Sequence, residues 1–154
     1  MKTNIVFDSK KLERRLEKIQ KQMPAKVDKA LVQTSLYGIN VITDSAAKGY
    51  GYKGRFAPYT PEYRKRKAEG WSSTPKTRGF GGAGSVGRPN LFLRGEMFGA
   101  MSAILERRGV AKIYFTRESE AKKAVFNEQK RPFFGFSKDG KDRLRKFFFN
   151  RVKI

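Results

Sequence analysis

Apolar residues near the start of the chain recur with the period of an amphipathic helix. Leu12, Leu16 and Ile19 follow one another at intervals of four and three residues, so their side chains share one face of a helix predicted over residues 10–22. Lysines, arginines and two glutamates occupy the other face. A β-branched and aromatic run at residues 3–7 precedes this helix and predicts a short strand.

A second helix is expected directly after Pro24. A proline suits the first turn of a helix, because the N–H that it lacks has no partner in that turn anyway. Apolar side chains then recur through residues 25–48, the longest periodic segment of the chain. We expect this helix to be the scaffold on which a sheet packs. Its apolar positions are Val27, Leu31, Leu36, Ile39 and Ile42.

Two strands are predicted in the second half of the chain, at residues 100–107 and 110–116. They meet at Arg108 and Gly109, which form a turn between them. Ile113 alternates with its neighbours along the second strand, as expected where one face of a strand is buried. The pair predicts an antiparallel hairpin.

Three helical segments surround these strands in the sequence. Residues 89–98 predict a turn into a short helix, residues 118–127 an amphipathic helix, and residues 142–152 a final basic helix. The expected inward positions are Ala121, Ala124 and Val125 in the middle segment and Leu144, Phe147, Phe148 and Val152 in the last. The predicted fold is therefore α+β, a small antiparallel sheet packed by helices on one side.

The composition changes between residues 49 and 90. Nine of the 15 glycines and four of the six prolines fall in these 42 residues, which also hold a short basic helix predicted at Pro61–Glu69. A long Gly/Pro-rich loop inside a compact domain is typically functional or disordered. We expect a single domain over residues 1–154, with 49–90 as an extended loop or arm. The arm is either a flexible surface insertion or a segment ordered against a neighbouring subunit or nucleic acid.

A rigid aromatic segment at residues 130–140 is the clearest local signal. Pro132 fixes its own backbone and biases Arg131 towards an extended conformation. We expect the segment to enter extended, dock its rings and turn at Gly140 before the final helix. Simple core packing is the alternative role for the rings. The candidate docking residues here are Arg131, Pro132, Phe133, Phe134 and Phe136.

Charge is the most unusual feature of the composition. The chain has 35 basic and 14 acidic residues, a net charge of +21, which nucleic acid or acidic neighbours would offset. The candidate contacts to nucleic acid or an acidic partner are Arg64, Lys65, Arg66, Lys67, Lys76 and Arg78, interleaved with the candidate docking aromatics Tyr59, Tyr63, Trp71 and Phe80. Cations would pair with phosphates and rings would stack on bases. Alternatively, the cations cover a solvated surface or pair with acidic subunits.

Catalysis and cofactor binding have little support. The chain lacks cysteine and histidine, which removes thiolate chemistry, the commonest general base and the commonest metal ligand. None of the 14 carboxylates forms a metal-binding or paired-acid motif, and the Gly-x-Gly-x-x-Gly at residues 79–84 lacks the flanking strand and helix of a dinucleotide site. No membrane span or signal peptide is apparent. We expect a non-enzymatic, cytoplasmic protein without metal or cofactor.

Three short motifs occur in the same order as in one protein family. The first, at residues 57–65, contains Pro58, Tyr59, Thr60, Tyr63 and Lys65. The second runs from Leu91 through Gly95 and Met97 to Ser102, and the third is Arg131-Pro132-Phe133 with Gly135, just before a C-terminal helix. Together they resemble the tail-completion, or virion morphogenesis, proteins of tailed bacteriophages, which include head–tail joining and neck proteins.

The resemblance implies a structural function. Proteins of this family form rings around the DNA passage at the head–tail junction or the tail terminus. The implied partners are copies of the same chain, other neck, tail or portal-side proteins, and DNA in the passage. The protein would be assembled in the bacterial host cytoplasm and end in the virion. The alternative, from the charge pattern, is a sequence-independent nucleic-acid-binding protein.

Overall fold

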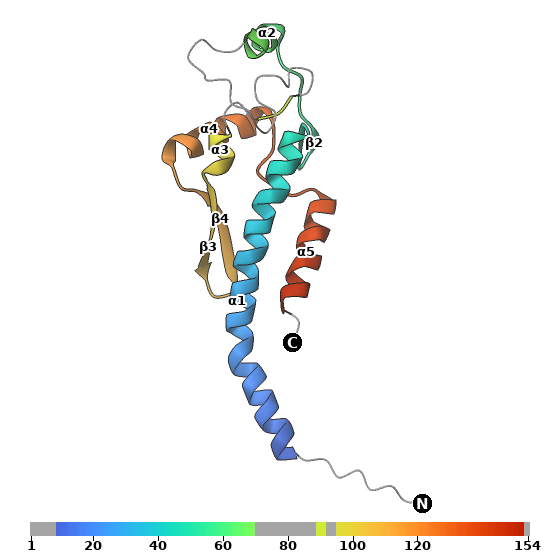
Figure 1. Ribbon diagram of the computed structural model, residues 1–154, viewed down its shortest axis with the longest axis vertical. Helices are drawn as coiled ribbons and strands as arrows, with labels where there is room; N and C mark the ends of the chain where they lie inside the picture. Colours follow the sequence, from blue (N-terminus) through green and yellow to red (C-terminus); the bar gives the residue numbers. More distant parts are fainter. Residues whose placement is uncertain (1–8, 70–88, 92–94, 153–154) are drawn as a thin grey trace, which may run out of the picture.

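The computed structural model describes residues 9–69, 89–91 and 95–152, and its central element is one long helix. Helix α1 spans Ser9–Ala47, and the other elements lie along or beyond its C-terminal two thirds (Figure 1). The predicted break at Pro24 is wrong, because Pro24 lies inside this helix. A proline there leaves the carbonyl one turn earlier without its usual donor. Residues 13–22 are exposed except Ile19, so water can reach that carbonyl.

The axis of α1 changes direction in its blue N-terminal part (Figure 1). Interior prolines are a common cause of such bends, because they remove one hydrogen bond of the helix and crowd the preceding turn. Pro24 is the proline in this helix. The two predicted helices are therefore a single bent one.

The predicted hairpin is confirmed. Strand β3 spans Met101–Arg107 and pairs antiparallel with β4, Val110–Phe115, so that Met101 lies opposite Phe115. Gly109 in the turn has a φ of 76°, which favours glycine. Its N–H donates to the Asp28 carboxylate of α1 at 2.9 Å. This bond fixes the tip of the hairpin to the long helix.

A second, very short hairpin follows α1 and was not predicted. It consists of β1, Tyr50–Gly51, and β2, Gly54–Arg55. It lies in the range expected to be a loop, as does α2, Pro61–Glu69, whose predicted bounds are confirmed. The strand predicted at residues 3–7 lies outside the described residues.

Three helices complete the described chain: α3, Glu96–Gly99; α4, Glu118–Lys130; and α5, Lys138–Val152. The turn expected at Gly140 is wrong, because Gly140 is a buried residue inside α5. Its N–H donates to the Ser137 hydroxyl at 3.2 Å, so Ser137 caps the helix. The Ser-x-x-Gly pattern therefore marks the start of α5.

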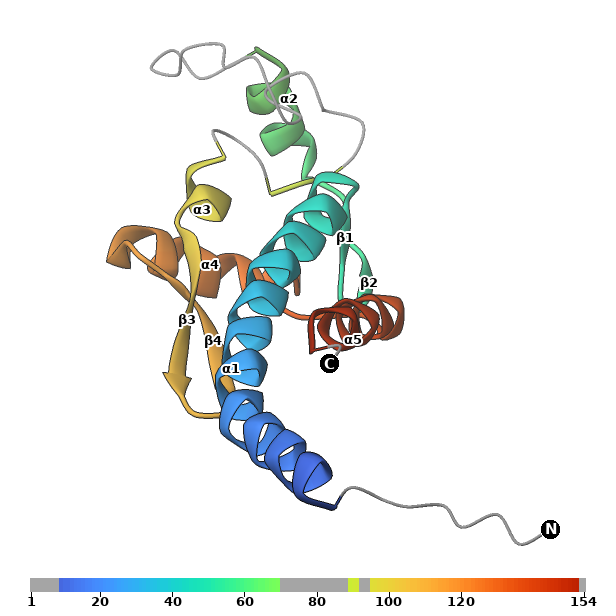
Figure 2. The same cartoon turned by 60° about the horizontal axis from the view of Figure 1, so that its bottom comes forward.

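Helix α5 and the β3–β4 hairpin lie on opposite sides of α1, with α3 and α4 near the upper end of the hairpin (Figures 1 and 2). The core lies where these elements meet and contains Ile42, Ala46, Phe56, Met97, Phe98, Met101, Ala124 and Phe133. Val125 was expected to point inward but is 63% exposed, because α4 instead turns Glu120 and Ala124 to the interior.

The fold class is α+β, as predicted. The described residues form five helices and two antiparallel two-stranded sheets. Among them, no helix is long and apolar enough to span a membrane.

Candidate functional site

The aromatic segment is held in place from both sides. Phe133 is the most deeply buried large side chain among the described residues, and its ring meets Phe98 edge-on at 5.5 Å between centroids. Phe136 packs as a half-buried ring against α1 at Gly38, where a β-carbon would lie only 2.9 Å from the ring. Phe134 is 38% exposed. The segment therefore docks two rings and presents the third.

Glu128, near the end of α4, holds the backbone of this segment. One of its carboxylate oxygens accepts the N–H groups of Phe133 and Phe134, each at 2.9 Å. A hydrogen bond from the Tyr52 hydroxyl to the same carboxylate raises the pKa of Tyr52 above its ordinary value. A carboxylate thus takes the place of a backbone partner for two consecutive amides.

The β1–β2 hairpin also packs against the aromatic segment. Gly51 approaches the Pro132 carbonyl so closely that a β-carbon at this position would overlap the oxygen. The ring of Tyr52 lies on Gly135. The backbone at Pro132 and Gly135 therefore packs directly against the hairpin.

A polar cluster around Tyr59, which we call the Tyr59 cluster, joins α2 to the residues before α3. It consists of Tyr59, Tyr63, Lys67, Asn90 and Arg131. The Lys67 ammonium donates to the Tyr59 hydroxyl at 2.9 Å and to the Asn90 side-chain oxygen at 2.7 Å. The Tyr59 hydroxyl donates to the Asn90 carbonyl and accepts the Asn90 N–H at 2.9 Å.

Arg131 connects this cluster to the aromatic segment. Its guanidinium lies 5.0 Å from the centroid of the Tyr59 ring, and the Tyr63 ring lies 4.8 Å from the Tyr59 ring. Residues from the first and third motifs of the sequence therefore meet in space. This contact places the start of the aromatic segment directly beside α2.

The electrostatics of the cluster follow from burial and positive charge. Lys67 is only 4% exposed, and burial, followed by repulsion from Arg131, lowers its pKa to about 8. Burial also raises the pKa values of Tyr59 and Tyr63. Among the described residues, the buried Nε of Arg131 has no hydrogen-bond partner. The cluster is a fixed concentration of positive charge, and the described residues contain no group of acids suited to a metal ion.

The other predicted site residues are only partly brought together. Arg64 and Lys65 are exposed on α2, whereas Lys67 is buried and bonded within the cluster. Arg66 belongs to the same helix, but its side chain is outside what the structure describes. Trp71, Lys76, Arg78 and Phe80 also lie outside the described residues.

Sequence reasoning missed several residues that build the site. Asn90, Glu128 and Gly51 carry no local pattern that marks them, because their partners are distant in the chain. Lys67 was singled out as a contact to nucleic acid or an acidic partner, but it is buried within the Tyr59 cluster; it follows Tyr63 by four residues and therefore shares its helix face.

Comparisons of the chain with models of known protein families, with curated proteins and with solved structures found no match.

Proposed function

We propose that this protein is a structural subunit of a tailed-phage virion that assembles into a ring at the head–tail junction or the tail terminus. The observation that carries the proposal is a pair of adjacent apolar side chains on α4. Val125 is 63% exposed and Phe126 is 58% exposed. Large apolar side chains grouped on a surface are typical of protein–protein contacts. The partner in the proposal is another copy of the chain.

The motif residues provide a second line of support. Arg131 stacks on Tyr59, while Phe133 and Glu128 fix the same segment from the core and from α4. A preorganised surface loses little conformational entropy when a neighbour docks on it. Phe134, which remains 38% exposed, would present an apolar ring to that neighbour. Other neck, tail or portal-side proteins would contact the ring above and below.

The test is the mass of the purified protein in solution, at physiological salt and with nucleic acid removed. We expect a defined ring, or a monomer that becomes one when tail-tube protein is added. A monomer that persists in both conditions would contradict the proposal.

Nucleic-acid binding remains the second candidate, because Arg64 and Lys65 are exposed on a chain of net charge +21. A persistent monomer that binds DNA of any sequence and ignores tail proteins would favour it. Affinity must then fall steeply with salt, since phosphate contacts release counterions.

A further inference from the structure

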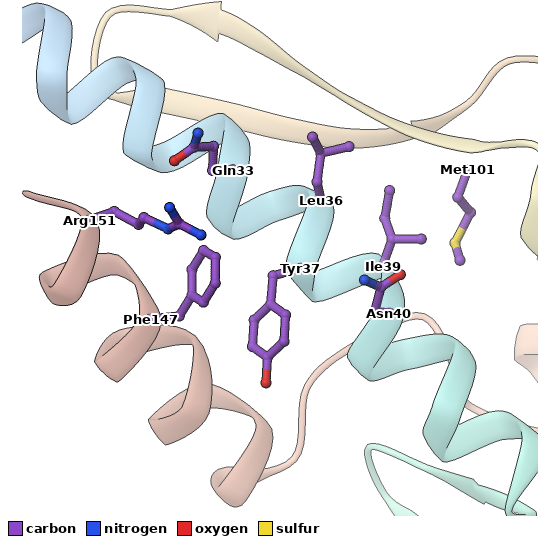
Figure 3. A pocket seen from close by; sticks show the side chains of 8 residues that line it. All are labelled: Gln33, Leu36, Tyr37, Ile39, Asn40, Met101, Phe147 and Arg151. Carbon is purple, nitrogen blue, oxygen red and sulfur yellow. The ribbon is translucent and has the colours of Figure 1, made fainter.

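An open groove lies on α1 between α5 and the start of β3 (Figure 3). Its volume is about 450 Å³, and its lining includes Gln33, Leu36, Tyr37, Asn40, Phe147 and Arg151. No described residue that lines it is acidic. Leu36 is 46% exposed there, so the floor is apolar and accessible. The groove therefore offers amides, an apolar floor and positive charge, without a carboxylate.

Two arginines of α5 are held in place by the aromatic wall of the groove. Tyr37 and Phe147 stack at 4.6 Å between ring centroids with an angle of 12° between their planes. The Arg151 guanidinium lies 4.9 Å from the Phe147 centroid. Figure 3 shows the two side chains next to each other. Arg143 donates to the Tyr37 hydroxyl at 3.1 Å. Guanidinium groups held by rings lose less freedom on binding than free side chains do.

The two arginines also share one stripe of α5. Arg143, Phe147 and Arg151 are spaced by four residues, so they lie above one another on the helix surface. Eight helical residues separate the guanidinium-bearing positions by about 12 Å. That distance corresponds to the axial rise of roughly three or four base-pair steps of B-DNA.

Two further exposed cations, Lys26 and Lys29, share the α1 face of Gln33, because the three residues are spaced by three and four positions. The exposed Lys138, Lys141 and Lys146 lie on other faces of α5. The acids nearby are few. Asp142 is paired with Arg145 at 3.2 Å, and Asp139 and Asp44 interact with Arg143. Among the described residues, Arg151 has no ion-pair partner, which makes it the stronger of the two candidate contacts.

We infer that the α1–α5 groove binds the sugar–phosphate backbone of DNA without sequence preference, with Arg143 and Arg151 as phosphate contacts. Arg143 and Arg151 on α5, with Lys26 and Lys29 on α1, form a group of cations that complements an extended polyanion better than an isolated carboxylate. The inference goes beyond the proposed ring, because one copy of the chain suffices for the contact. It also assigns DNA to a surface other than α2.

The test is the salt dependence of binding to a short random-sequence DNA duplex, measured by fluorescence anisotropy. The variant Arg143→Gln/Arg151→Gln removes one charge that lines the groove and one that is bonded to its Tyr37 wall, and Arg64→Gln/Lys65→Gln removes two from exposed α2. Each lost phosphate contact reduces the slope of log affinity against log salt by about one. We expect the groove variant to lose about two units of slope and the α2 variant to lose a small fraction of one.

Two further variants keep the test decisive. Arg151→Gln leaves the bond between Arg143 and Tyr37 intact, and we expect it to lose about one unit of slope even if the double variant folds poorly. Arg143→Lys/Arg151→Lys keeps both charges, and we expect it to retain the salt slope. We expect its affinity to fall several-fold, because lysine lacks the planar guanidinium that can bind a phosphate through two N–H groups.

Equal loss of slope in the groove and α2 variants would overturn the inference, as would an unchanged groove variant. Competition by polyglutamate at the same charge concentration as DNA would also overturn it, in favour of an acidic protein partner. The solution mass of each variant is measured in parallel. Failure of the DNA contact is therefore distinguishable from failure of ring assembly.

Discussion

The carbonyl oxygen of Pro132 occupies the space that a side chain at Gly51 would need. The two residues are far apart in the sequence and belong to the β1–β2 hairpin and the aromatic segment. Because the obstructing atom belongs to the backbone, a side-chain rotation cannot relieve the overlap. The docking of the segment therefore depends on glycine at position 51.

Replacing Gly51 by alanine is expected to lower the free energy of unfolding by about 1–3 kcal/mol, the usual cost of forcing a methyl group into a packed site. Urea denaturation measures the change. Gly99→Ala is the matched control, because a β-carbon there meets nothing within 4 Å. A Gly51→Ala protein as stable as the control would show that the hairpin does not hold the segment in solution.

Removal of the Glu128 carboxylate should loosen the same segment by another route. Glu128→Ala leaves the N–H of Phe133 without its acceptor, at a cost of about 1–3 kcal/mol, while water can reach the N–H of the more exposed Phe134. Glu128→Gln should cost less, since its amide oxygen still accepts. The same urea titration applies.

The control for this prediction is Glu118→Ala on the same helix. Its side chain is 81% exposed and pairs with exposed Lys122, so we expect a change below about 0.5 kcal/mol. Equal effects from the two substitutions would mean that Glu128 acts merely as a surface charge.

Lys67 should make stability depend on pH in the alkaline range. Its pKa is about 8 in the folded protein and near 10.5 when unfolded, so between these values the unfolded chain binds more protons. Stability therefore rises with pH above about 8, and below that value the folded state carries the full cost of the buried charge. The raised pKa values of Tyr59 and Tyr63 act in the opposite direction only near and above 10.0, the ordinary tyrosine value.

The useful window is thus from pH 8 to about 9.5, over which we expect a gain of about 1–2 kcal/mol attributable to Lys67. Urea titrations at several pH values measure it, with Lys67→Met as the reference that lacks the titrating group. If the unfolding free energies of the two proteins changed equally with pH, the lowered pKa of Lys67 would be refuted.

The exposed pair on α4 should affect assembly and leave folding unchanged. Val125→Ser/Phe126→Ser removes apolar surface that is already more than half exposed, so we expect less than about 0.5 kcal/mol in stability. In contrast, we expect the apparent affinity of assembly, measured by light scattering, to fall at least tenfold. Ile104→Ser, at a position 52% exposed on β3, is the control and should assemble normally. Wild-type assembly by the double variant would remove this surface from the ring interface.

Local patterns were enough to predict much of the fold. The turn at Arg108 and Gly109 and the alternation around Ile113 indicated the β3–β4 hairpin, and the basic run at Pro61–Glu69 was placed correctly as a helix. These signals are carried by neighbouring residues. The predicted break at Pro24 was wrong because a proline is compatible both with the first turn of a new helix and with the interior of a bent one. Solvent exposure of the preceding turn decided between them.

The candidate site was harder to predict because its parts come from distant segments. Arg131 and Tyr59 were both singled out, but no local pattern showed that one stacks on the other. Val125 was assigned to the interior from helical period alone, whereas the neighbours of α4 selected the face that carries Glu120 and Ala124. Tertiary packing thus chose among faces that the sequence pattern left nearly equivalent.

The bond from Gly109 to Asp28 divides α1 into two parts with different local stability. On its C-terminal side the helix is covered by the hairpin and α5. On the other side, residues 13–22 are exposed apart from Ile19, and an uncovered helix of this length is marginal in water. Amide hydrogen exchange should therefore accelerate progressively from residue 28 towards residue 13, because those turns can open without unfolding the core. A partner that slows the exchange of these amides would therefore be one that binds this projecting part of α1.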